Sequence, residues 1–163
     1  MADYKITTDI LAPSDKKVIE YTGFHPSRII KMMPDIIKDT LKVEGGSVFE
    51  DKIKWDISGD PVSFYGDWRG KYAFDGRSSA NFKINAQGSQ GAKDRIGKIK
   101  ITIKGGVETK FPFTTPIQQS LVRIYTYLFY NKQRREYIDT GKVLINRIED
   151  EIRSAFNLIK RGG

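Results

Sequence analysis

The stretch that decides the fold is Val62–Phe74, which reads VSFYGDWRGKYAF. Apolar or glycine residues occupy every second position from Val62 to Phe74, and mostly polar residues occupy the positions between them. A period of two over this length is typical of a β-strand with one buried and one exposed face. A sheet of such strands needs a cover on its apolar face, and that cover can include a ligand.

The same alternation continues on both sides of this stretch. Strands are expected over residues 16–21, 48–57, 62–74, 80–86, 98–104 and 107–113. Asp75-Gly76 is a strong hairpin signal, and Gly105-Gly106 is expected to turn the chain between the last two strands. The polar segment Gln87–Asp94 is expected to form a loop. Because no helical pattern interrupts residues 48–113, we expect an antiparallel meander of about six strands.

Helical patterns flank the sheet on both sides. Isoleucine and methionine recur at helical spacing after the first strand, but Pro34 interrupts them. Because proline fits best in the first turn of a helix, two short helices are expected, over 26–33 and 34–42. After the sheet, Thr115-Pro116 is a helix start, and an amphipathic pattern continues to about residue 160. Gly141 is expected to weaken or bend this helical tail.

The length of 163 residues fits one domain over 1–163, with an N-terminal segment over 1–14 and the helical tail over 114–160. The chain contains no cysteine, which excludes disulfides and zinc–thiolate sites. No stretch has the apolar run of a signal peptide or of a membrane span. A cytoplasmic protein is therefore expected.

The formal charge of +8 is distributed unevenly along the chain. Residues 1–47 hold seven basic and seven acidic side chains, residues 48–113 hold twelve against eight, and residues 114–163 hold nine against five. The excess therefore lies on the sheet and on the helical tail. Its field favours anionic partners such as nucleic acid, phosphorylated ligands or acidic lipid surfaces.

Eight basic residues share the polar positions of the predicted strands. They are Lys52, Lys54, Arg69, Lys71, Lys83, Lys98, Lys100 and Lys104. If the strands are neighbours, these side chains converge on one surface that can contact phosphates. The alternative is a solvated face whose lysines protect the sheet from edge pairing. Tyr65 is the one aromatic residue at these positions, so the stacking platforms typical of single-strand binding are mostly missing.

Constellations of catalytic residues are nearly absent from the sequence. The single histidine, His25, precedes a proline and has no partner nearby in sequence that would make it a general base. No group of His, Asp and Glu residues has the spacing of a metal site. We therefore expect no catalytic residue, no metal and no cofactor, and the sequence favours a non-enzymatic protein.

A second cluster lies in the helical tail, where Tyr125, Tyr130, Arg134 and Arg135 follow one another within eleven residues. Tyrosines and arginines spaced around a helix are suited to an anionic head group or a partner surface. Tyrosines at such positions are more often residues at the edge of the core with hydrated hydroxyl groups. Both interpretations stay open on the sequence.

The order of elements over residues 14–160 is a strand, a helix pair around Pro34, an antiparallel meander and a long helix ending near Ile159. This order resembles the helix-grip fold of START-like lipid-transfer domains, birch-pollen-allergen-like proteins and polyketide cyclase-like proteins. The resemblance implies an α+β fold whose curved sheet packs its concave face on the C-terminal helix around a cavity for an apolar molecule. The implied cavity wall consists of Phe49, Ile53, Trp55, Phe64, Trp68, Tyr72, Phe82, Ile84, Ile101, Phe111, Ile148, Ile152 and Phe156.

The sequence departs from that family in two respects. Its helical tail is about twice the usual length, so Pro116–Thr140 is expected to be an additional lid or a partner-binding helix. The catalytic polar residues of the family are not evident, which argues against cyclase activity. The sequence thus predicts non-enzymatic binding of a hydrophobic or amphipathic, lipid-like molecule between sheet and helix. The alternative is docking on nucleic acid, a ribonucleoprotein or an anionic membrane surface through the lysine-rich positions.

Overall fold

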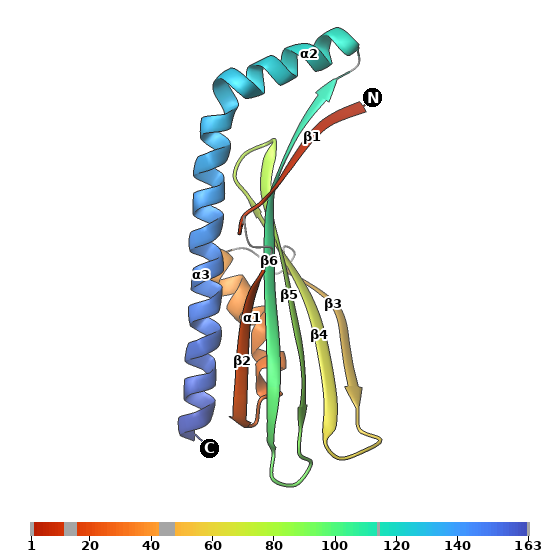
Figure 1. The fold of residues 1–163 in the computed structure, drawn as a ribbon, viewed down its shortest axis with the longest axis vertical. Coiled ribbons are helices and arrows are strands. Elements are labelled where there is room, and N and C mark those ends of the chain that lie inside the picture. Colours follow the sequence, from red (N-terminus) through yellow and green to blue (C-terminus); the bar gives the residue numbers. More distant parts are fainter. Residues whose placement is uncertain (1, 12–15, 43–47, 114, 163) are drawn as a thin grey trace.

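The computed structural model describes residues 2–11, 16–42, 48–113 and 115–162. Figure 1 shows an elongated molecule in which a long helix runs beside a twisted sheet. The elements are β1 (Ala2–Asp9), β2 (Lys17–Phe24), α1 (Arg28–Leu41), β3 (Val48–Asp56), β4 (Val62–Ala73), β5 (Ser78–Gln90), β6 (Ile96–Phe113), α2 (Pro116–Tyr125), the π-helical turn η2 (Thr126–Tyr130) and α3 (Asn131–Gly162).

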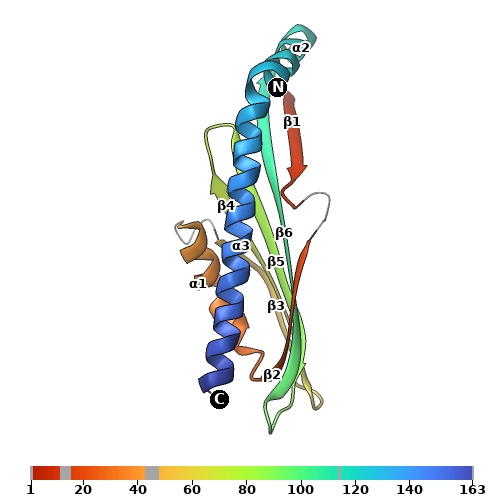
Figure 2. The same cartoon turned by 60° about the vertical axis from the view of Figure 1, so that its left-hand side comes forward.

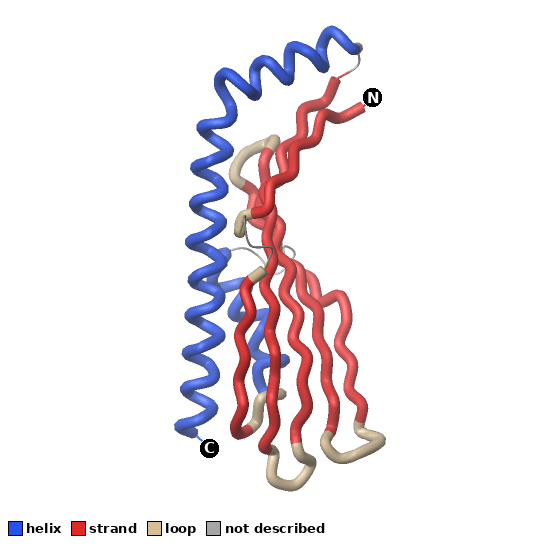
Figure 3. The backbone as a smooth tube through the Cα atoms, in the orientation of Figure 1, coloured by secondary structure: helices blue, strands red, loops and turns tan. Residues whose placement is uncertain are grey.

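The six strands form one antiparallel sheet in the order β1-β6-β5-β4-β3, and β2 also pairs with β6. The 18-residue strand β6 has two partners on one side, because β2 pairs with Ile96–Ile103 and β1 pairs with Gly106–Phe113. The paired ends of β1 and β6 extend beyond the other strands toward α2 (Figure 3). The sheet is therefore broad at one end of the molecule and narrow at the other.

Both long helices cover the same face of the sheet. α1 packs on β3 and β4, α3 packs mainly on β2 and β6, and the two helices contact each other (Figure 2). The buried core between them includes Trp68, Phe82, Ile101 and Ile148, each no more than 1% exposed. The predicted α+β class, with a six-stranded antiparallel sheet packed on a long C-terminal helix, is confirmed.

The prediction of two short helices around Pro34 is wrong, because α1 runs through the proline as one helix. Ile29, Ile30 and Met33 before the proline and Ile36, Ile37 and Leu41 after it are all buried. An interior proline costs a helix about 3 kcal/mol, and burial of a continuous apolar face offsets a cost of that size.

Three strand predictions also need correction. β1 lies in the segment 1–14, for which no strand was predicted, and β5 extends to Gln90 into the expected loop. The expected turn at Gly105-Gly106 does not form, since β6 passes straight through it. A Cβ atom on Gly105 would lie 2.9 Å from Ile145 Cδ1 and 3.1 Å from Ile10 Cδ1. Glycine is needed here for close packing, not for a turn.

Gly141 on α3 is also needed for close packing against Ile10. α3 continues through Gly141, and a Cβ atom there would lie only 2.6 Å from Ile10 Cδ1. Ile10 itself is completely buried, and its N–H donates to the carbonyl of Gly105 at 3.0 Å. Gly105, Ile10 and Gly141 therefore form a close contact between α3 and β6, which we name the waist of the molecule.

Candidate binding surfaces

The predicted cavity wall is distributed over the inner face of the sheet and α3. Phe64, Trp68, Phe82, Ile84, Ile101, Ile148, Ile152 and Phe156 are buried together in one hydrophobic cluster. Ile53 and Tyr72 pack at its margin. Phe49 and Trp55 are 44% and 46% exposed on the edge strand β3, and Phe111 lies outside the cluster, with its ring 5.4 Å from that of Tyr130. The apolar side chains of sheet and helices contact one another where the sequence predicted a ligand.

Glycines on β4 explain how this space is filled. A Cβ on Gly70 would lie 2.9 Å from both Ile37 and Leu41 of α1, and a Cβ on Gly66 would overlap the indole ring of Trp68. The missing side chain at Gly70 therefore makes room for α1 against the sheet, and the one at Gly66 makes room for the Trp68 ring. The two glycines on the apolar side of Val62–Phe74 are the sequence signal from which close packing could have been inferred.

The tyrosines and arginines of the helical tail are separated by the structure. Tyr125 and Arg135 are exposed, whereas Tyr130 and Arg134 are buried. Arg134 Nε donates to Thr109 Oγ1 at 3.0 Å, and Nη2 donates to Thr8 Oγ1 at 2.9 Å. Arg134 thus ties α3 to both β1 and β6, and these contacts turn it away from a role on the surface.

Asp75 is the centre of this polar network, and the sequence indicated only its turn. Its Oδ2 accepts from the hydroxyls of Tyr130 and Tyr137 at 2.6 and 2.7 Å, and its Oδ1 accepts from the N–H groups of Arg77 and Ser78 at 2.7 Å each. Burial by itself would raise the pKa of Asp75, but these four donors outweigh it and hold the pKa at about 2. Burial and the bond to Asp75 raise the pKa of Tyr130 to about 12.

These contacts fix the bend between α2 and α3 to the sheet. Tyr130 also bonds to Ser78 Oγ at 2.8 Å, and the ring of Tyr137 stacks on Phe74 with centroids 4.3 Å apart. The network therefore holds the β4–β5 turn against the helical tail, and we assign it a structural role.

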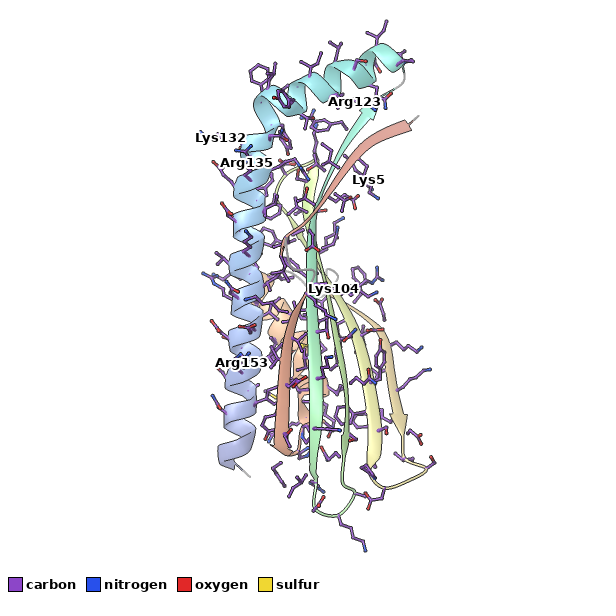
Figure 4. The ribbon with its side chains drawn as sticks, in the orientation of Figure 1. Lys5, Lys104, Arg123, Lys132, Arg135 and Arg153 are labelled. Carbon is purple, nitrogen blue, oxygen red and sulfur yellow. The ribbon has the colours of Figure 1, made fainter. Side chains whose placement is uncertain are left out.

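The predicted basic residues lie on the outer face of the sheet, opposite α1 and α3. We name this surface the lysine-rich face; it comprises Lys52, Lys54, Arg69, Lys71, Lys83, Lys98, Lys100 and Lys104, all exposed. Arg69 lies directly opposite Lys83, and Lys83 lies directly opposite Lys104. These three form a row of cations across β4, β5 and β6, which we name the cation row. Figure 4 labels Lys104 on β6.

The charges on this face are only partly compensated. Arg69 pairs with Asp51 at 2.6 Å, and the other seven residues have no ion pair among the described residues. The neighbouring ammonium group of Lys52 lowers the pKa of Lys54, as expected where like charges gather. Two aromatic side chains of this face have partners within it: Tyr65 donates to Asp67 at 2.8 Å, and the ring of Phe49, which lies opposite Arg69, is 5.2 Å from its guanidinium group.

Two shallow hollows open beside these lysines. One, of about 660 Å³, is lined by residues of β2, β5 and β6, including Lys98 and Lys100. The other, of about 720 Å³, is lined by residues of β3, β4 and β5, including Lys54 and Tyr65. They share Gln87 and Gly88. The protein therefore offers an open surface with polar and apolar lining on both sides of β5.

His25 lies at the entrance to α1, with its Nδ1 3.4 Å from Ser27 Oγ. This separation is long for a hydrogen bond that would activate a serine. Across the described ranges, no three His, Asp or Glu side chains are grouped as a metal site would require. The lysine-rich face and the two hollows beside it are therefore the candidate binding features on the sheet.

The predicted lid or partner-binding segment forms α2, η2 and the first part of α3 (Figure 1). Its start is confirmed, since Thr115 Oγ1 accepts from the N–H of Gln118 at 3.2 Å. None of the ten residues of α2 is buried. Its apolar residues are therefore a second exposed surface, distinct from the lysine-rich face.

No protein-family model matches this chain, and no curated protein is significantly similar to it. Three solved structures are similar over most of their length. A protein of unknown function, SA2116 from Staphylococcus aureus, is 8% identical with a TM-score of 0.21, covering 88% of this chain and 97% of its own. Ara h 8.0201 is 12% identical with a TM-score of 0.22, covering 85% and 97%.

The third is a putative uncharacterized protein from Rhizobium leguminosarum, 9% identical with a TM-score of 0.26, covering 94% of this chain and 99% of its own. Identities and TM-scores at this level establish no shared function. Within the described ranges, no helix has the length and apolar character needed to cross a membrane.

Proposed function

We propose that this protein is a non-catalytic binding protein that docks on the phosphate backbone of nucleic acid through its lysine-rich face. The observation that carries the proposal is the cation row, in which Arg69, Lys83 and Lys104 lie directly opposite one another on adjacent strands. Like charges in directly opposite positions destabilise a sheet. A sequence that keeps such a local cost commonly does so at a functional site.

Protection against edge pairing does not account for the cation row. That role belongs to lysines on edge strands, and it fits Lys52 and Lys54 on β3. β4, β5 and β6 each have strands on both sides, so Lys83 and Lys104 have no free edge to protect. A partner that supplies negative charge along the face would relieve the repulsion between these side chains.

The residues between the cations favour nucleic acid over a lipid surface. Asn85, Gln87, Ser89 and Thr102 lie on the outer face of β5 and β6, beside Lys98 and Lys100. Neutral donors of this type accompany lysine and arginine where proteins contact phosphate and sugar oxygens. The exposed apolar residues of this face, Val18 and Phe49, lie on strands at opposite margins of the sheet and form no continuous apolar surface that a bilayer would bind. Contacts of this kind give salt-dependent binding that is largely independent of base sequence.

The test is the double charge reversal Lys83→Glu/Lys104→Glu. Fluorescence anisotropy with labelled RNA and duplex DNA should show binding that weakens with salt, and the variant should lose about tenfold to a hundredfold in affinity. The matched control is Lys31→Glu/Lys142→Glu, which has the same net charge but alters α1 and α3. It should bind almost as wild type does.

Equal losses in both variants would assign the binding to net charge alone and would contradict a site on the sheet. Binding to anionic vesicles but not to nucleic acid, lost in Lys83→Glu/Lys104→Glu, would reassign the face to membranes. In both variants, circular dichroism should report an unchanged fold, because all four substituted positions are exposed and the reversal on the sheet replaces one like-charge pair, at positions 83 and 104, by another.

The interior ligand predicted from the sequence is the second candidate, and fewer observations support it. Most of the predicted wall residues pack against one another in the hydrophobic core between the sheet and the helices. The hypothesis requires that Ile148 and Ile152 move away from the sheet when a ligand enters. Native mass spectrometry of the purified protein tests it, and a retained apolar molecule that Ile148→Trp displaces would favour it over the closed interior.

A further inference from the structure

α2 and η2 expose a continuous stripe of aliphatic side chains. Ile117, Leu121, Ile124 and Leu128 are 74%, 60%, 56% and 61% exposed. Their spacing of four, three and four residues places them on one side of a helix. We name these four residues the α2 stripe. Proteins rarely expose several apolar side chains side by side unless they form an interaction site.

The α2 stripe points away from the rest of the protein. The opposite side of the same helix carries Val122, Thr126 and Tyr130, which are half-buried or buried. Tyr130 is held to the sheet by Asp75, and its ring contacts Phe111 on β6. At about 100° per residue, these positions lie roughly half a turn from the stripe. The helix is therefore already seated on its own protein through its other side, and the stripe is left for a partner.

The position of α2 in the molecule restricts the shape of that partner. Figures 1 and 2 show α2 at one end of the long axis, crosswise to α3 and outside the tips of β1 and β6. A flat partner can therefore approach the full length of α2 without meeting the sheet or α1. A bilayer surface has this geometry, and an amphipathic helix binds it by lying in its plane.

The charges around the stripe favour an anionic surface. Residues 116–135 contain four basic residues and no acidic residue. Arg134 is buried in its contacts with the sheet, and Arg123 lies on the side of the helix that carries Tyr130, so Lys132 and Arg135 are the basic residues on the side of the stripe. Lys132 and Arg135 lie beside the bend at the outer margin of the molecule (Figure 4). Tyr127 and Phe129, both exposed, flank the stripe with aromatic rings. Basic side chains beside aliphatic and aromatic ones are typical of helices at the boundary between anionic head groups and acyl chains.

A second copy of the chain fits this surface less well. The stripe spans four seam positions, whereas a coiled coil needs three or four heptads. The cations around the stripe would also face one another across a symmetric interface, where like charges repel. The apolar surface is wider than a coiled-coil seam, because Tyr127 and Phe129 extend it on both sides.

We propose that α2 and η2 form a docking element for anionic membranes, with the α2 stripe inserted below the head groups and the neighbouring cations in contact with lipid phosphates. This inference concerns a different surface from the lysine-rich face and does not depend on nucleic-acid binding. The partner is the lipid surface itself, bound through both its charge and its acyl chains.

The first experiment measures sedimentation with vesicles of phosphatidylcholine containing about a third phosphatidylglycerol, at low and at high salt. The variant Leu121→Gln/Ile124→Gln keeps good helix formers and removes two anchors, and its partition coefficient should fall at least about tenfold. The matched control Ile57→Gln/Val143→Gln removes two exposed apolar residues elsewhere and should bind as wild type does.

The second experiment reads insertion directly. Since the chain has no cysteine, Leu128→Cys gives a single attachment point for an environment-sensitive dye. On addition of anionic vesicles its emission should shift to the blue and rise several-fold, while the same dye on Val143→Cys should not respond. Vesicles of phosphatidylcholine alone should produce a much weaker response.

Equal binding by Leu121→Gln/Ile124→Gln and wild type, or an unchanged dye at position 128, would overturn the proposal. Dimerisation in analytical ultracentrifugation that the same variant abolishes, without vesicle binding, would assign the stripe to a second copy instead. Lys83→Glu/Lys104→Glu should bind vesicles normally, so failure of the nucleic-acid proposal is distinguishable from failure of this one.

Discussion

The two ends of this protein differ in whether the apolar side of their helices is buried or exposed. At the broad end, α1 and α3 cover the sheet, and Trp68, Ile101 and Ile148 are completely buried. At the narrow end, α2 buries none of its ten residues, although its sequence is also that of an amphipathic helix. An apolar stripe on a helix therefore indicates that something covers it, without indicating whether the cover is the same chain. The exposed stripe is the one that points to a partner.

The largest expected effect is a difference in unfolding free energy between alanine substitutions of two leucines on the same helical tail. Leu144→Ala should cost about 3 kcal/mol of unfolding free energy, because Leu144 is buried against the sheet. Leu121→Ala should change it by less than about 0.5 kcal/mol, since Leu121 is exposed. Urea unfolding followed by circular dichroism measures both. A similar cost at the two positions would break the comparison, because it would mean that the protein itself covers α2.

The next effect concerns the waist that divides the two ends. Gly141→Ala places a Cβ 2.6 Å from Ile10 Cδ1, and overpacking of this kind costs about 1–3 kcal/mol. The gain in helix propensity offsets about 1 kcal/mol of that cost. A net loss of stability is expected in thermal unfolding.

The matched rescue for Gly141→Ala is Ile10→Val, because valine lacks the Cδ1 atom that the new methyl group would meet. The double variant should be closer to wild type than the sum of the two single changes predicts. Stabilisation by Gly141→Ala alone would show that the space around Ile10 accepts an additional methyl group without overpacking.

Asp75 gives a smaller effect with a pH signature. Its folded pKa of about 2 lies below its ordinary value of 3.8, so its contribution to stability is present above about pH 4 and is lost as pH falls through 2. Because Asp75 is exposed, solvent screening reduces this contribution to about 1 kcal/mol. Asp75→Asn should lose it at pH 7 and should remove this part of the acid sensitivity.

Chemical denaturation at pH 7, 4 and 2.5 measures the difference between Asp75→Asn and wild type. The difference should be largest at pH 7 and smallest at pH 2.5. Tyr137→Phe removes one of the four donors and should give a fraction of the same effect. A difference that does not change with pH would show that the carboxylate charge contributes nothing to the bend.

The smallest expected effect is confined to α2. Thr115→Ala removes the side-chain cap on the N–H of Gln118 and should cost about 0.5–1 kcal/mol of local helix stability. Because no buried residue of α2 offsets that loss, amide exchange in the first turns should accelerate. The global unfolding midpoint should stay unchanged, and a shift in it would mean that α2 folds as part of the core.

The strands and their two faces were predictable because a period of two is a local property of the sequence. The positions of Phe64, Trp68 and Ile84 inside, and of Lys83 and Lys100 outside, followed from parity alone. The continuity of α1 through Pro34 and of β6 through Gly105 was not predictable from local rules, because packing against distant residues decided both.

The polar network at the bend was hidden for a similar reason. Asp75 and Tyr130 are 55 residues apart, and only the folded chain brings the carboxylate to the hydroxyl group. The direction of the α2 stripe also depends on this contact, since Tyr130 determines which side of the helix faces the sheet. The sequence predicted an amphipathic helix there but not which way it would face.

Because of the bend between α2 and α3, the length of α3 would set the distance between the sheet and a membrane that binds α2. α3 has 32 residues, which at 1.5 Å per residue is about 48 Å, and it runs crosswise to α2 (Figure 1). With α2 lying in the membrane plane, α3 and the sheet beside it would extend away from the membrane surface. The Asp75 network would then fix the angle between α3 and the membrane, and a partner on the lysine-rich face would be held at a fixed distance from the lipid.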